Sequence, residues 1–115
     1  MTKDEIFHRL DRAAADIMAM AKKDTNRTKT EITNSDSTRH LVEMVLMRRS
    51  YLGLLSDEVN IAQMLLLDEH NGGTREDKQR ITAKINEVKQ NLAAIASELE
   101  GARVTKMKQL KNALT

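Results

Sequence analysis

The sequence predicts an all-α fold, an antiparallel three-helix bundle in which the second and third helices form a long coiled-coil-like hairpin and the first packs against it. The chain has no proline, four glycines and 31% charged residues, a composition typical of long helices. Apolar residues recur at alternating steps of four and three, as in helices that pack side by side. Most residues from Leu41 to Leu67 are apolar, too many for one stripe, so the central helix is expected to be covered on two sides.

The size and composition favour one domain, residues 1–115, with an aliphatic core. Hydrophobic residues make up 40% of the chain but aromatic residues only 2%. The absence of cysteine excludes disulfides and thiolate metal sites and suits a reducing compartment. No apolar run approaches the length of a membrane span, and the N-terminus lacks the apolar core of a secretory signal. We therefore expect a cytoplasmic protein that does not enter the membrane.

The first helix is expected over residues 3–23. Thr2 and Glu5 have the spacing of a capping box, in which each side chain accepts a hydrogen bond from the other residue's backbone N–H. The apolar positions that follow form a narrow seam, here meaning a line of core-facing residues on one side of a helix. This first seam consists of Ile6, Leu10, Ala13, Ile17 and Met20.

Residues 24–35 are expected to form a loop. The apolar pattern stops there, and threonine, asparagine and serine become frequent. These side chains can hydrogen-bond to the backbone nearby and so compete with a helix. The alternation over residues 28–33 also leaves room for a short extended piece.

The central helix is expected over residues 36–70, with a cap from Ser35, Asp36 or Ser37. The sequence Asn-Gly-Gly at 71–73 should end it, because glycine readily adopts the left-handed conformation at a helix C-terminus.

The third helix is expected over residues 74–114 and begins with a second capping pair, Thr74 and Asp77. Gly101 is a point where it could kink or end. Its seam consists of Ile81, Ile85, Val88, Leu92, Ile95, Leu99 and Ala102.

Two registers follow from these seams. Seven pairs lie at equal distances from the turn at Gly73 and Thr74, and they predict layers between the second and third helices: Leu66/Ile81, Ala62/Ile85, Val59/Val88, Leu55/Leu92, Leu52/Ile95, Arg48/Leu99 and Val45/Ala102. Four pairs centred on Ile32 predict layers between the first and second: Met20/Met44, Ile17/Met47, Ala13/Tyr51 and Leu10/Leu54. Arg48 is charged within a seam. Its head can extend toward Glu98 or Glu100, or it can fix the register or oligomeric state.

Basic residues are expected to gather at one end of the bundle although the net charge is only +2. An antiparallel bundle brings together residues 24–35, the start of the central helix and the end of the third. This basic pole contains Lys22, Lys23, Arg27, Lys29, Arg39, Arg103, Lys106, Lys108 and Lys111. Contact with an acidic partner or with the phosphates of duplex DNA is the functional interpretation. The alternative is that cations at helix C-termini stabilise the helix dipole. The candidate binding residues are Arg27, Lys29, Arg103, Lys106, Lys108 and Lys111.

The end of the third helix is expected to extend past the start of the central helix. Its apolar side chains then need cover from residues 24–35, through Ile32, or from a second subunit. An amphipathic overhang on a narrow bundle favours the subunit, and hence a homo-oligomer. The candidate oligomer or partner contacts are Met107, Leu110 and Leu114.

No catalytic constellation, metal site or cofactor site is predicted. His8, His40 and His70 are too far apart along the chain to converge on a metal through one helix face. Gly72-Gly73 lacks the lysine and the strand of a phosphate-binding loop. The sequence therefore predicts a protein that is not an enzyme.

Two stretches resemble the central helical hairpin of small terminase subunits from large contractile-tailed phages. One runs from Ala13-Ala14-Ala15-Asp16-Ile17 to Ala21-Lys22. The other is Asp36-Ser37-Thr38-Arg39-His40-Leu41, where the family usually has Asp-Ser-Pro-Arg. Thr38 replaces that proline, the preceding loop is longer, and the third helix has no counterpart. The resemblance implies a non-enzymatic protein that forms rings and helps a motor ATPase to engage viral DNA.

The leading functional hypothesis is accordingly a helical interaction and oligomerisation protein, a phage-type DNA-packaging adaptor in the cytoplasm of a bacterial host. The alternative is a protein-binding adaptor or inhibitor, of phage or bacterial origin, with no nucleic-acid role.

Overall fold

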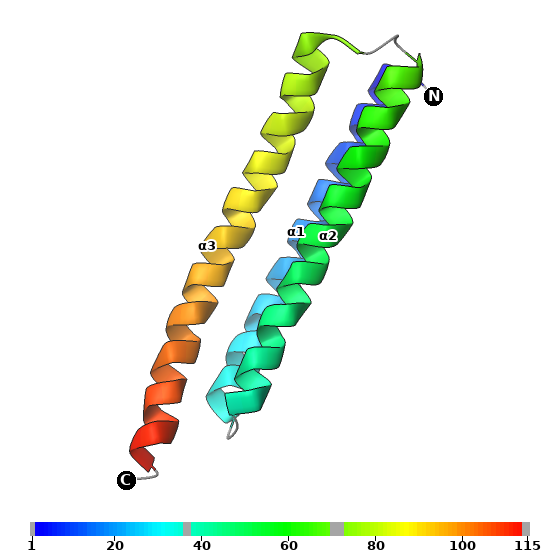
Figure 1. Cartoon of the computed structure of the whole chain (residues 1–115). Coiled ribbons are helices and arrows are strands. Elements are labelled where there is room, and N and C mark those ends of the chain that lie inside the picture. Colours follow the sequence, from blue (N-terminus) through cyan, green and yellow to red (C-terminus); the bar gives the residue numbers. More distant parts are fainter. Residues whose placement is uncertain (1, 36–37, 70–72, 114–115) are drawn as a thin grey trace.

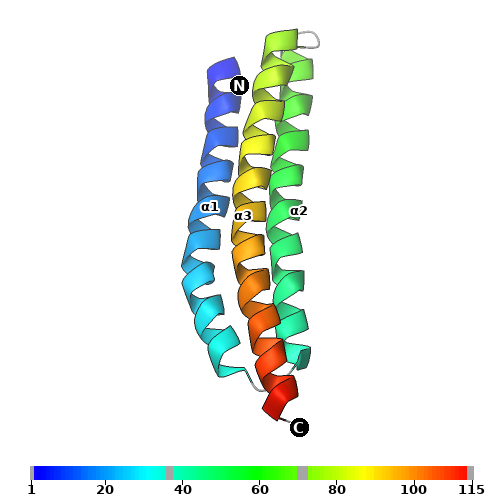
Figure 2. The same ribbon diagram turned by 90° about the vertical axis from the view of Figure 1, so that its left-hand side faces the viewer.

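The computed structural model is an up-down-up bundle of three long helices (Figure 1). It describes the backbone of residues 2–35, 38–69 and 73–113, and side chains for residues 2–35, 51–68 and 73–113. The helices are α1 (Lys3–Asn34), α2 (Thr38–Glu69) and α3 (Arg75–Ala113). They lie nearly parallel to one long axis in a rod of 65 × 20 × 17 Å (Figure 2). The predicted all-α three-helix bundle is confirmed.

Both predicted capping boxes form. At α1, the Glu5 N–H donates to the Thr2 hydroxyl, and the Thr2 N–H donates to the Glu5 carboxylate, each at 3.2 Å. At α3, Thr74 and Asp77 exchange the same two bonds at 3.1 Å. Gly73, just before this cap, has a φ of 65°, the left-handed value expected of the residue that follows a helix. Gly101 does not end α3, which continues to Ala113.

The expected loop at residues 24–35 is wrong, because α1 continues to Asn34. The threonines that were expected to disrupt the helix instead donate back to carbonyls one turn earlier. Thr25 bonds to the Ala21 carbonyl oxygen at 2.6 Å, and Thr30 and Thr33 make the equivalent bonds. Ile32 supplies the tertiary contact that holds this extension, since it is buried in a cluster with Leu99 of α3. The short extended piece considered for residues 28–33 is wrong for the same reason.

The upper half of the bundle contains one continuous hydrophobic core. All eight residues of the first four predicted layers between α2 and α3, from Leu66/Ile81 to Leu55/Leu92, belong to this cluster. Ile81 is fully buried and Leu55 is 1% exposed. The core also includes Phe7 of α1, whose ring lies under the Arg80 guanidinium at 4.0 Å. This cation–π contact joins α1 to α3.

Of the three lower predicted layers, only Leu52/Ile95 has both side chains described. Leu52 is 38% exposed, and Leu99 packs against Ile32 together with Ile95, Ala102 and Leu110. Ile32 of α1 therefore contributes to the cover of Leu99. The side chains of Val45 and Arg48, which the last two predicted layers require, lie outside the described residues.

The seam predicted for α1 is shifted by one position over part of its length. Phe7, Ala14 and Ala21 are buried, whereas Met20 is 44% exposed and Ala13 only half-buried. The predicted layer of Leu10 with Leu54 is also wrong, because Leu54 is 52% exposed. The predicted pairs assumed that the turn between α1 and α2 is centred on residue 32. Because α1 continues to Asn34, the turn lies later in the chain, and each α1 residue is level with a later residue of α2 than predicted.

Parallel α1 and α3 are connected by ion pairs along their length. Lys3 contacts Asp77 at 2.6 Å, Lys84 contacts Asp11 at 3.6 Å, and Lys29 pairs with Glu98 farther down. The hydrogen bond from Lys3 lowers the pKa of Asp77, and the bonds from Thr74 add to this against the opposing effect of burial. Asp77 therefore stays ionised at a pH at which an ordinary aspartate takes up a proton.

Candidate functional site

The structure brings the six predicted basic residues to one end of the rod. Arg27 and Lys29 lie near the C-terminal end of α1, and Arg103, Lys106, Lys108 and Lys111 near that of α3. Because α1 and α3 are parallel, both C-terminal ends meet there, as Figure 1 shows. The predicted grouping of these positions at one end is therefore present.

Four of these six residues are engaged within the chain. Arg27 contacts Asp24 at 3.4 Å and Glu31 at 3.8 Å, Lys29 pairs with Glu98, and Arg103 pairs with Glu100. The Lys106 ammonium donates to the Thr33 carbonyl oxygen at 2.7 Å. Three of the four cations thus have a carboxylate partner, which reduces the positive potential of the pole.

Lys108 and Lys111 are exposed, and no ion pair of theirs is found within the described part of the chain. The same holds for Lys22 and Lys23 on the outer side of α1. The side chain of Arg39 lies outside the described residues. Among the described side chains of the basic pole, the cations without an ion pair or a side-chain hydrogen bond are therefore Lys108 and Lys111 on the last turns of α3 and Lys22 and Lys23 on α1.

The predicted oligomer contacts have different environments. Leu110 is half-buried against Ile32 and Leu99 of its own chain. Met107 is 38% exposed, as is Val104 at 43%. Leu114 lies outside the described residues. Extended α1 covers part of the expected overhang, and Val104 and Met107 keep an apolar surface open to solvent.

The described residues also form an apolar groove between α2 and α3 that was not predicted from the sequence. It encloses about 510 Å³ and is lined by Ala21, Asp24, Thr25, Thr28, Tyr51, Leu52, Ser56, Lys89, Leu92, Ala93, Ile95, Ala96 and Leu99. Ala21 of α1 is buried, so α1 forms the floor. Ser56 and Ala93 are exposed, so the mouth lies between α2 and α3. We call this cavity, with its mouth, the α2–α3 groove.

A second hollow continues along the same side of the bundle toward the α2–α3 turn. It encloses about 450 Å³ and is lined by Gln63, Leu66, Leu67, Gly73, Lys78, Ile81 and Thr82, all from α2 and α3 or the turn between them. Leu67, on its rim, is 49% exposed. The two hollows together mark the side of the bundle that α1 does not cover.

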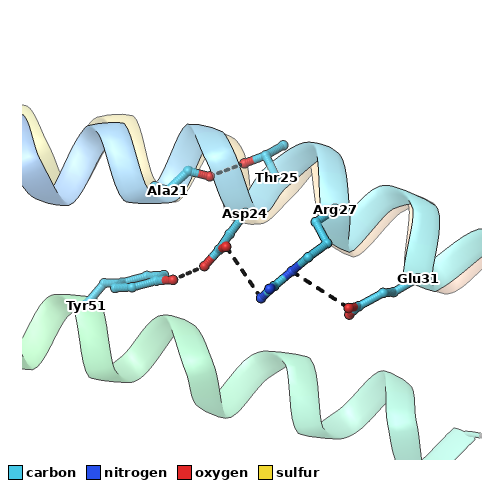
Figure 3. A network of polar contacts seen from close by, with 6 residues as sticks. All are labelled: Ala21, Asp24, Thr25, Arg27, Glu31 and Tyr51. Atoms are coloured by element: carbon cyan, nitrogen blue, oxygen red, sulfur yellow. Dashed lines mark hydrogen bonds and ion pairs between the residues drawn. The ribbon is translucent and has the colours of Figure 1, made fainter.

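A polar network forms one wall of the groove (Figure 3). The Tyr51 hydroxyl donates to Asp24, which also contacts Arg27, and Arg27 reaches Glu31. The hydrogen bond to Asp24, with a smaller effect of burial, raises the pKa of Tyr51. The network ties α2 to the part of α1 that was expected to be a loop. Its signal in the sequence was the i, i+3 and i+4 spacing of Asp24, Arg27 and Glu31.

Within the described residues, no group of three or more histidine, aspartate or glutamate side chains is placed to hold a metal ion. His8 is exposed on α1, and His40 and His70 lie outside the described side chains. No described helix combines the length and apolar content needed to cross a bilayer. Comparisons with protein-family models, with curated proteins and with solved structures find no match. The class that the structure defines is an all-α three-helix bundle with an apolar groove on one side.

Proposed function

We propose that the chain is a non-enzymatic helical interaction protein that binds another protein in the α2–α3 groove. The observation that carries this proposal is the apolar lining of a groove that opens to solvent, with Leu92, Ile95 and Leu99 among its residues. A solvent-exposed apolar surface of this kind is typical of binding sites. We also propose a cytoplasmic location, because a chain without cysteine suits a reducing compartment.

The polar residues of the groove support binding rather than catalysis. Tyr51 is held by Asp24, and its raised pKa makes the phenolate less accessible near neutral pH. Asp24 is in turn occupied by Tyr51 and Arg27. Both side chains are thus engaged with each other, which favours a structural role for them.

Site-specific photo-crosslinking tests this function. A photo-reactive residue in place of Ser56, at the groove mouth, should crosslink to a protein in cells that naturally express the chain. The same residue in place of Ala15, which is exposed on α1, is the matched control. Equal crosslinking from both positions, or none from Ser56, would contradict the proposal. The mass of the product distinguishes a second copy from a different protein.

The second candidate is a DNA-packaging adaptor that self-associates, as the resemblance to small terminase subunits suggests. Lys108 and Lys111 favour it, since both are exposed near the end of α3 without an ion pair in the described region. Met107, which is exposed on the same part of α3, favours self-association.

For this candidate, the double variant Lys108→Gln and Lys111→Gln should weaken duplex-DNA binding and its salt dependence. Each phosphate contact contributes about −0.9 to the slope of log affinity against log salt, so the slope should flatten by nearly two units. The measurement is fluorescence anisotropy at several salt concentrations, with light scattering to define the oligomer. The control is Lys29→Gln, which breaks an internal ion pair and should affect stability more than the slope. No duplex binding at low salt would remove this candidate.

A further inference from the structure

The three helices occupy three corners of a four-helix arrangement. α1 packs on both α2 and α3, which contact each other less than either contacts α1. Leu52, which was expected to pack on Ile95 across the α2–α3 seam, is 38% exposed, and both residues line the groove. The unfilled corner is therefore the one diagonal to α1, between α2 and α3.

The length and shape of this corner match an α-helix better than a compact ligand. The two hollows follow α3 from Lys78 to Leu99, about 31 Å at 1.5 Å per residue. Four-helix bundles place helices side by side over such lengths. Ala93 and Ala96 on α3 and Ser56 on α2 are small, so a fourth helix can approach closely.

The charged side chains at this corner indicate which charge a helix docked there should carry. The charged side chains that line the two hollows are Asp24, Lys78 and Lys89. Asp24 already pairs with Tyr51 and Arg27, whereas Lys78 and Lys89 are exposed and make no ion pair with a described residue. These lysines are eleven residues apart, three helical turns, and so lie on the same side of α3, about 16 Å from each other.

We propose that the α2–α3 groove receives one amphipathic, acidic α-helix of a partner protein, with its apolar face on the groove and carboxylates opposite Lys78 and Lys89. This inference rests on the proposed function and adds the chemistry of the partner. A second copy fits less well, because a two-fold interface places the same patch on both sides. The rims would then oppose lysines to lysines, with no available carboxylate among the described lining residues.

The test uses two synthetic helical peptides of about 20 residues with the same apolar seam, one flanked by glutamates and the other by lysines. Fluorescence anisotropy measures their binding to the whole chain. The glutamate peptide should bind about tenfold more tightly, and added salt should reduce the difference. The double variant Lys78→Glu and Lys89→Glu should reverse the preference. The double variant Lys22→Glu and Lys23→Glu has the same net charge but lies away from the groove, and should not reverse it.

A blocked groove separates specific docking from surface adhesion. Ser56→Trp should abolish binding of the glutamate peptide, while Ala15→Trp should not, provided that both variants keep the helicity of the parent. Equal affinity for both peptides, or equal effects of the two lysine pairs, would overturn the acidic-helix assignment. So would light scattering that finds a dimer which Ser56→Trp dissociates, since the groove would then hold a second copy. A crosslink from Ser56 to a different protein that carries no acidic helix would refute this inference and leave the proposed function standing.

Discussion

Replacing Leu55 by alanine is expected to lower the free energy of unfolding by about 2–5 kcal/mol, the range for buried leucines that leave a cavity. Leu55 is 1% exposed and belongs to the main core cluster of all three helices. Urea unfolding followed by circular dichroism measures the change.

The adjacent residue provides the control. Leu54 is 52% exposed, so Leu54→Ala should change stability by less than about 0.5 kcal/mol. Both variants delete the same atoms at neighbouring positions of α2, so helix propensity cancels and burial is compared alone. A large loss of unfolding free energy in Leu54→Ala would instead support the register predicted from the sequence, in which Leu54 packs on Leu10.

The second large effect is expected at Phe7. Phe7→Ala should cost about 3–5 kcal/mol, because the ring is 2% exposed and also carries the Arg80 guanidinium. Chemical denaturation again gives the free energy of unfolding. Met20→Ala is the contrasting variant in the same helix, since Met20 is 44% exposed. Comparable losses at the two positions would mean that α1 is rotated from its described orientation.

The fold class was predictable because it depends on patterns that act along one helix at a time. Capping boxes at Thr2 and Thr74 and the seam from Ile81 to Leu92 are local signals, and all appear in the structure. The face that α1 presents was less predictable. Ala13 and Ala14 are chemically identical, so only the partner helix decides which of them is buried.

The end of α1 could not be predicted for a related reason. Threonine-rich residues 24–34 have weak helix propensity, and what holds them is contact with α3 through Ile32 and Lys29. That contact joins residues far apart in sequence. The six candidate basic residues do lie toward one end of the rod, but their partners depend on the same extension, which places Lys29 beside Glu98 and Lys106 beside Thr33.

The groove depends on how the three helices are placed around one another, and a sequence pattern that lists apolar positions does not give that placement. In the sequence, the spacing of Leu52, Leu92 and Ile95 is that of ordinary core positions. Only the position of α1, packed against both other helices on one side, leaves them at an open surface.

The two hydrophobic clusters also divide the bundle into a region expected to open locally and a region expected to open only when the whole chain unfolds. Among the described side chains, the lower cluster contains two buried residues, Ile32 and Leu99, from helices that are not neighbours in sequence. Within residues 24–34, all of which are described, Ile32 is the one buried side chain, and segments with few buried apolar contacts are the first to open. Amide hydrogens of residues 24–34 should therefore exchange with solvent through local opening, whereas those around Leu55 and Ile81 should need global unfolding. The segment that contributes Asp24, Thr25 and Thr28 to the lining of the groove is thus expected to open before the main core does.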